Sequence, residues 1–141
     1  MARNVFPTTM HTWIGRELDR GDSGRQAVNT HIMATYAFPL RVYFLGTDSR
    51  WLGEPDDLID GFFADRLDRS DFLPRWQASG LPLRRWLMTA FNFYLKEQRR
   101  AQIRNRPSGV DPEAEITFEG DPETAMDRAV IISFVRNALE D

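Results

Sequence analysis

The amino-acid sequence predicts an all-α protein, a compact bundle of about four to five helices followed by a linker and a further helix. First, apolar residues recur at the three-and-four spacing of a buried helix face in successive segments. Second, Gly, Pro and Ser separate these segments, and several of them begin with a cap, a Pro or an acid. Third, 42% of the residues are hydrophobic, with four Trp and ten Phe, which is ample for a packed core.

Length and composition limit the possible classes of protein. A chain of 141 residues has room for one core and at most a small appendage. The absence of Cys excludes disulfides, thiolate metal sites and Cys nucleophiles, and it fits a reducing compartment. No secretory signal is visible and no apolar run approaches about 18 residues, so the sequence excludes a membrane span. We therefore expect a cytoplasmic protein.

A short break separates the first two predicted helices. Pro7 and two Thr hydroxyls precede a helix over about residues 9–20. Residues 21–23 break it, and Ser23 is expected to cap the next helix, which covers about residues 24–45. We expect Pro39 to kink or divide this second helix, because Pro removes a backbone donor. Its apolar stripe consists of Val28, Ile32, Tyr36, Leu40 and either Tyr43 or Phe44.

The third predicted helix, about residues 54–69, is acidic on one side. It follows a loop at residues 46–53, has Pro55 in its first turn and buries Leu58, Ile59, Phe62 and Phe63. From residue 54 to 71 seven acids face two Arg, a net charge of −5. Small residues beside outward acids would let a basic helix of a partner approach closely. The outward residues are Asp57, Asp60 and Asp68, with Gly61 and Ala64 beside them.

The longest predicted helix, residues 83–106, is basic. It follows a short helix at residues 72–78 and a loop at residues 79–82. Seven Arg or Lys and one Glu give residues 81–106 a net charge of +6. The buried face is predicted to contain Leu83, Trp86, Leu87, Ala90, Phe91, Tyr94 and Leu95. The opposite face is predicted to contain Arg85, Met88, Asn92, Lys96 and Arg99, flanked by Thr89 and Arg100. A helix that is apolar on one side and basic on the other suits a nucleic-acid partner.

The composition changes after the basic helix. Residues 1–106 form the predicted helical domain, residues 107–120 an acidic linker, and residues 121–141 a C-terminal amphipathic helix. From residue 107 onward nine acids face two Arg, a net charge of −7. We expect this last helix to be the start of a truncated continuation, and we expect the whole segment to contribute little to the core.

Motifs for catalysis and metal binding are weak. Residues 56–60 (DDLID) have the spacing of the aspartate-rich magnesium motif of all-helical isoprenoid enzymes. That site needs a second acidic motif across a deep cavity, which a chain of this length does not offer. His11 and His31 have no acid at metal-ligand spacing, and no phosphate loop or nucleophile triad is present. We therefore expect a protein that is not an enzyme and needs no metal or cofactor.

Five motifs, in order, resemble a known family. An N-terminal FPTT (residues 6–9) and a Y-x-x-P-L segment (residues 36–40) precede DDL-x-x-GFFA-x-RL, DFL and RRWL-x-x-A-x-N-x-x-L-x-x-x-RR. Together they resemble region two of bacterial sigma factors, and more narrowly the planctomycete-type subgroup of the extracytoplasmic-function class. The similarity covers about residues 5–106. Asp60 stands where the subgroup usually has Gln, and the helix-turn-helix of region four has no counterpart in these 141 residues.

The resemblance implies a sigma factor that acts in transcription initiation. It implies that the acidic helix docks on the coiled coil of the polymerase beta-prime subunit through Asp56, Asp57, Asp60, Gly61 and Ala64. It implies that the basic helix captures the non-template strand of the −10 promoter element as the DNA melts. The expected DNA-binding residues are Ser79, Gly80, Arg84, Arg85, Asn92, Lys96, Arg99 and Arg100, with the Ser79–Gly80 loop shaping a pocket for a base. The acidic linker would lie in the positively charged RNA channel, and an anti-sigma factor is admitted as a further partner.

Two alternatives stay open at this point. One is a sigma-like helical interaction module or decoy that holds polymerase or a regulator without opening DNA. The acidic stripe serves both functions, whereas only the sigma function needs the basic face of the residue 83–106 helix. The other alternative, a diphosphate enzyme, would require magnesium binding. The promoter sequence, the activating signal, the oligomeric state and the presence of region four are not determined by these residues.

Overall fold

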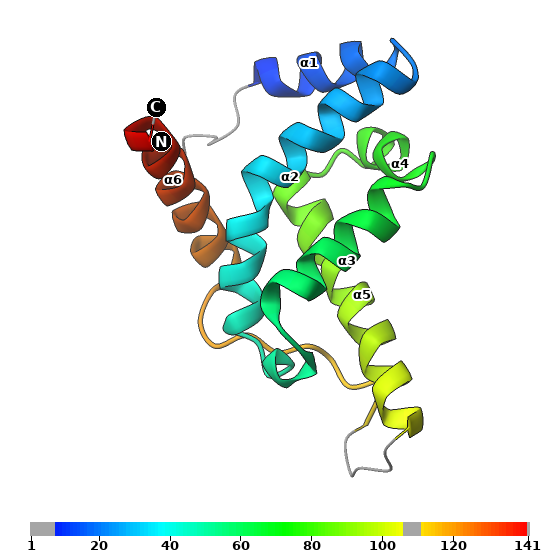
Figure 1. Cartoon of the computed structure of the whole chain (residues 1–141), viewed down its shortest axis with the longest axis vertical. Helices are drawn as coiled ribbons and strands as arrows, with labels where there is room; N and C mark the ends of the chain where they lie inside the picture. Colours follow the sequence, from blue (N-terminus) through cyan, green and yellow to red (C-terminus); the bar gives the residue numbers. More distant parts are fainter. Residues whose placement is uncertain (1–7, 106–110, 141) are drawn as a thin grey trace.

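The computed structural model describes residues 8–105 and 111–140. In this part of the chain 78% of the structure is helical and no strand is present, which confirms the all-α prediction. Figure 1 shows α2 in the middle of the molecule, with α6 on one side of it and α3, α4 and α5 on the other. The elements are α1 (Thr8–Leu18), α2 (Asp22–Leu45), a 3-10 turn (Arg50–Leu52), α3 (Pro55–Leu67), α4 (Phe72–Ser79), α5 (Leu83–Asn105) and α6 (Pro122–Glu140).

The core is formed where α2, α3 and α5 meet. The ring of Phe62 lies 5.2 Å from that of Phe91 and 5.8 Å from that of Tyr94, and both pairs are edge-on. Such edge-on contacts add to the free energy that burial of the rings contributes. The structure confirms that Leu40, Leu58, Phe62, Phe91 and Tyr94 share one core, whereas Trp86 is only partly buried against it.

The structure bears on two local predictions for α2. The helix continues from Asp22 to Leu45, so Pro39 does not divide it. Pro39 and its neighbours Tyr36, Leu40 and Tyr43 are buried, so packing on the core offsets the missing backbone donor. The prediction that Ser23 caps this helix is wrong, because the helix begins at Asp22, one residue before Ser23, and Gly21 stands at the N-cap.

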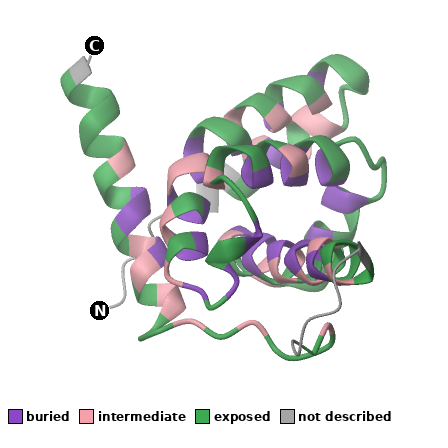
Figure 2. Ribbon diagram, turned by 60° about the horizontal axis from the view of Figure 1, so that its bottom comes forward, coloured by how far each residue is buried: buried purple, intermediate pink, exposed green. Residues whose placement is uncertain are grey.

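The segment after the linker belongs to the bundle, and the expectation that it contributes little to the core is wrong. Met126 and Val130 on α6 are fully buried, and Ala129 is 2% exposed. Their three-and-four spacing places them on one face of α6, which packs against α2. Figure 2 shows that the C-terminal half of α6 is mostly exposed.

Within residues 8–105 and 111–140, none of the helices combines the length and the apolar character that a bilayer crossing requires.

Candidate functional site

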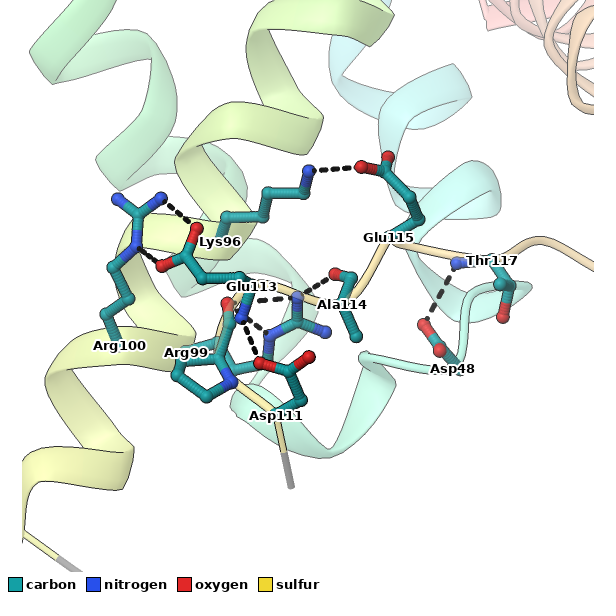
Figure 3. A network of polar contacts seen from close by, with 10 residues as sticks. Asp48, Lys96, Arg99, Arg100, Asp111, Glu113, Ala114, Glu115 and Thr117 are labelled. Carbon is teal, nitrogen blue, oxygen red and sulfur yellow. Dashed lines mark hydrogen bonds and ion pairs between the residues drawn. The ribbon is translucent and has the colours of Figure 1, made fainter. Parts of the chain in front are cut away.

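Five basic side chains of α5 contact the same stretch of chain. We call residues 111–127 the acidic segment, because it contains seven Asp or Glu and no Lys or Arg. It lies beside α5 and continues into the first turns of α6 (Figure 3). Four predicted DNA-binding cations form ion pairs with it: Arg84 Nε with Asp127 Oδ1 at 3.0 Å, Arg85 Nε with Glu123 Oε1 at 2.9 Å, Lys96 Nζ with Glu115 Oε1 at 3.0 Å, and Arg100 Nε with Glu113 Oε1 at 2.5 Å.

Arg99 contacts the same segment through its backbone. Its guanidinium donates to the carbonyl of Pro112, at 3.3 Å from Nε and 3.2 Å from Nη2, and also to the carbonyl of Ala114. Arg99 is therefore only 3% exposed, and Met88 on the same side of α5 is 8% exposed. The prediction of an outward face at these two positions is wrong, because the acidic segment and α6 cover that side of the helix.

Asn92 lies where α5 meets an aromatic anchor of the acidic segment. The hydroxyl of Tyr43 donates to Asn92 Oδ1 at 2.6 Å. Burial raises the pKa of Tyr43, against the opposing effect of its hydrogen bond with Asn92. Phe118 stacks on Tyr43, with ring centroids 5.2 Å apart and an interplanar angle of 11°. It also fits against Gly46, where an added Cβ would lie 2.3 Å from the Phe118 ring.

Backbone hydrogen bonds hold the acidic segment in place beside the end of α2. Thr47 and Phe118 form an isolated antiparallel bridge. On one side of it the amide of Asp48 donates to the carbonyl of Thr117 at 3.0 Å, and on the other the amide of Glu119 donates to the carbonyl of Gly46 at 3.3 Å. The amide of Thr117 also donates to Asp48 Oδ1 at 3.2 Å. The segment is thus anchored by main-chain and apolar contacts as well as by charge.

The pKa of Glu113 reports directly on the contact with α5. The hydrogen bond from Arg100, together with the charges of Arg100, Lys96 and Arg99, holds the pKa of this carboxyl below its ordinary value of 4.5. A carboxyl with a lowered pKa stabilises the contact above its unfolded pKa, and that contribution is lost as the pH falls through the folded pKa.

We expect an NMR titration of Glu113 to show a midpoint below 4.5 in the intact protein. In Arg100→Gln the midpoint should rise, because the donor that favours the carboxylate has been removed. Glu54→Gln serves as a control, since this exposed residue precedes α3 and its side chain caps no backbone amide. An unchanged Glu113 midpoint in Arg100→Gln would contradict the pairing.

The Ser79–Gly80 loop is closed by its own hydrogen bonds. Ser79 Oγ donates to the carbonyl of Trp76 at 2.6 Å and accepts from the amide of Leu81 at 3.1 Å. Trp76 Nε1 donates to the carbonyl of Leu81 at 2.8 Å. Gly80 has φ of 74°, a left-handed conformation that favours glycine. Both predicted residues are exposed, and the loop turns the chain from α4 into α5.

Sequence reasoning missed a cleft of about 360 Å³ between α4, α5 and the end of α3. Phe93 is 59% exposed there, and Phe72 packs against Trp86 with ring centroids 5.8 Å apart. Exposed rings beside guanidinium groups suit an unstacked base and its backbone. Three different elements contribute to the cleft, so no sequence period could reveal it. Its lining residues are Arg66, Arg69, Phe72, Arg75, Trp86, Thr89, Ala90, Phe93 and Glu97.

The acidic side of α3 is exposed, with one exception. Asp56, Asp57, Asp60 and Ala64 are exposed, and Asp56 lies 3.4 Å from Arg41 on α2. Gly61 instead faces the interior, where an added Cβ would lie 2.4 Å from the Tyr94 hydroxyl. The prediction that Gly61 lies in the outward stripe is therefore wrong, and its small size serves the packing of α3 on α5.

A groove lined by both apolar and charged side chains adjoins this stripe. It lies between α2, α3 and α6, and Met33, Phe38 and Ile59 contribute apolar side chains. Asp56, Asp60, Arg41 and Arg136 contribute the charges. Asp60 and Met33 also line a second cleft with Ala64, so the two hollows are continuous along α3. A helical partner with basic side chains would fit this combination of carboxylates and apolar surface.

In the part of the chain that the structure describes, no group of three or more His, Cys, Asp or Glu side chains could hold a metal ion. Of the two histidines, His31 has a pKa lowered by burial and packs edge-on against Trp13, with ring centroids 5.3 Å apart.

Comparison of the chain with protein-family models, with curated protein sequences and with solved structures found no match.

Proposed function

We propose that this chain is a sigma factor of bacterial RNA polymerase that acts in transcription initiation. Its region-two-like bundle would bind the core enzyme and recognise and melt the −10 element. The observation that supports this proposal best is that one small bundle has two surfaces of opposite charge. The carboxylates of α3 adjoin a groove with both apolar and charged side chains, whereas α5 carries the basic side chains and adjoins the aromatic cleft.

Each surface supports one part of the proposal. Asp56, Asp57 and Asp60 would attract the basic coiled coil of the beta-prime subunit, and the groove would receive its apolar side chains. The α5 cations would follow the phosphates of the non-template strand, and Phe93 with Trp86 would stack on a base that has left the duplex.

Asp57→Lys with Asp60→Lys is expected to weaken binding to core RNA polymerase by about tenfold or more, because repulsion replaces attraction at the interface. Asp19→Lys with Asp71→Lys is the matched control, since it makes the same change of charge at exposed positions near α1 and α4. Binding is measured with labelled protein and purified core enzyme. If both double variants lose the same affinity, or neither loses any, the docking surface is not α3.

One observation favours the decoy alternative. The α5 cations are already paired within the chain, as they would be in a module that never binds DNA. Open-complex formation by the holoenzyme separates the two functions, because a decoy would bind polymerase and leave promoter DNA closed.

A further inference from the structure

The acidic segment presents to α5 the same chemistry as a nucleic-acid backbone. The carboxylates of Glu113 and Glu115 pair with Arg100 and Lys96, while that of Asp111 accepts from the Glu113 amide at 2.9 Å and shapes the turn that carries them. Glu113 binds Arg100 with both oxygens, at 2.5 and 2.9 Å, which is the geometry that guanidinium groups use on phosphates. Two carbonyls of the same stretch accept hydrogen bonds from Nε and Nη2 of Arg99.

The contact has an exposed charged part and a buried apolar part. The Arg100 and Glu113 side chains are 45% and 61% exposed, and Glu115 is 85% exposed, so each pair by itself is weak. Phe118, stacked on Tyr43, and Met126, buried at the start of α6, anchor the segment on the C-terminal side of these two pairs. The stretch before Phe118 is weakly bound through its carboxylates, so it can be displaced from α5 without unfolding the bundle.

We propose that the acidic segment is a built-in competitor that occupies the nucleic-acid face of α5 and keeps it closed until the segment is displaced. The proposal rests on the proposed function, since it assigns a regulation to the same face. A strand of DNA or RNA must replace the carboxylates at Arg85, Lys96 and Arg100 and the carbonyls at Arg99. An agent that opens the face must offer the freed carboxylates cations of its own.

The test neutralises the paired carboxylates in the intact 141-residue chain. Glu113→Gln, Glu115→Gln and Glu123→Gln together remove three ion pairs while keeping the shape of each side chain. This triple variant is expected to bind a labelled single strand of about 20 nucleotides roughly tenfold more tightly than the unaltered chain. The control variant, Asp19→Asn, Glu54→Gln and Glu119→Gln, makes the same change in net charge at exposed positions that do not pair with α5 and should bind within about twofold of the unaltered chain.

A reversible disulfide that fixes the acidic segment to the end of α2 should have the opposite effect on strand binding. Thr47 and Phe118 are a non-hydrogen-bonded antiparallel pair, whose Cα atoms lie about 4.5 Å apart, within the range that a disulfide spans. The chain has no Cys, so Thr47→Cys with Phe118→Cys can form a single defined disulfide. The oxidised form should bind the strand several-fold more weakly than the reduced form of the same variant.

The outcomes distinguish this proposal from the function on which it rests. Equal, measurable binding by the two triple variants would overturn the competitor alone. Binding by none of the variants, with polymerase still captured through Asp57 and Asp60, would overturn both the competitor and the DNA-binding part of the proposed function. The competitor proposal is supported by tighter binding of the Glu113, Glu115 and Glu123 triple variant together with weaker binding of the oxidised disulfide variant.

Discussion

Trp76→Ala is expected to lower the free energy of unfolding by about 3–5 kcal/mol, the usual range for truncating a buried large aromatic side chain. Trp76 is 1% exposed, and its ring lies 4.3 Å from that of His11 on α1. The substitution also leaves the carbonyl of Leu81 without its indole donor, so the α4–α5 loop should loosen.

Urea denaturation followed by far-ultraviolet circular dichroism measures this loss without relying on tryptophan fluorescence. Trp51→Ala is the matched control, because Trp51 is 49% exposed and its replacement should change stability by no more than about 0.5 kcal/mol. Similar losses in the two variants would contradict the packing of α4 between α1 and α5.

Met126→Asp is expected to release α6 from α2, with a loss of at least about 3 kcal/mol in docking free energy. Met126 is fully buried, so the change both empties an apolar site and places a carboxylate there. Since Val130 lies one turn further along the same face, the loss should extend along the helix.

Hydrogen exchange reports this release residue by residue. Amides of α6 should lose protection in Met126→Asp while those of α3 and α5 keep most of theirs. Ile132→Asp is the control, because Ile132 is 48% exposed on the same helix. Protection of α6 that survives Met126→Asp would show that the helix is held by other contacts.

The helices were predictable because their signals are local. Pro55 and Pro122 begin α3 and α6 as their positions predict, and both Tyr43 and Phe44 close the apolar stripe of α2. Pro39 does not divide α2 as one of the two predicted effects would have it, because its cost is also local whereas the packing that offsets it comes from other elements. Trp86 was ranked with the core by its helical phase alone, and only the positions of α3 and α4 determine how much of its ring is covered.

The candidate site was predictable only in part. The opposite charges of α5 and of the segment after it are visible in the sequence, but their register is not, because a segment of turns and irregular chain contributes no helical period. Two signals could have revealed the contact: the acids Glu113 and Glu115 soon after the basic helix, and the apolar Ile116 and Phe118 within a polar stretch. The inward direction of Gly61 depends on where Tyr94 lies across the core, which no local pattern contains.

The pairing of α5 with its own chain changes how salt acts on a competing strand. When a strand replaces the carboxylates, its phosphates release condensed cations into solution, which normally makes the affinity fall steeply with salt. Here the displaced Glu113, Glu115 and Glu123 are exposed at the same moment and gather cations of their own. The release of cations by the phosphates and their uptake by the freed carboxylates offset one another. Ionic strength therefore has less influence on the affinity for the strand than the charge of α5 suggests. The balance between strand and segment then depends mainly on uncharged contacts, the Phe118 ring on one side and stacked bases on the other.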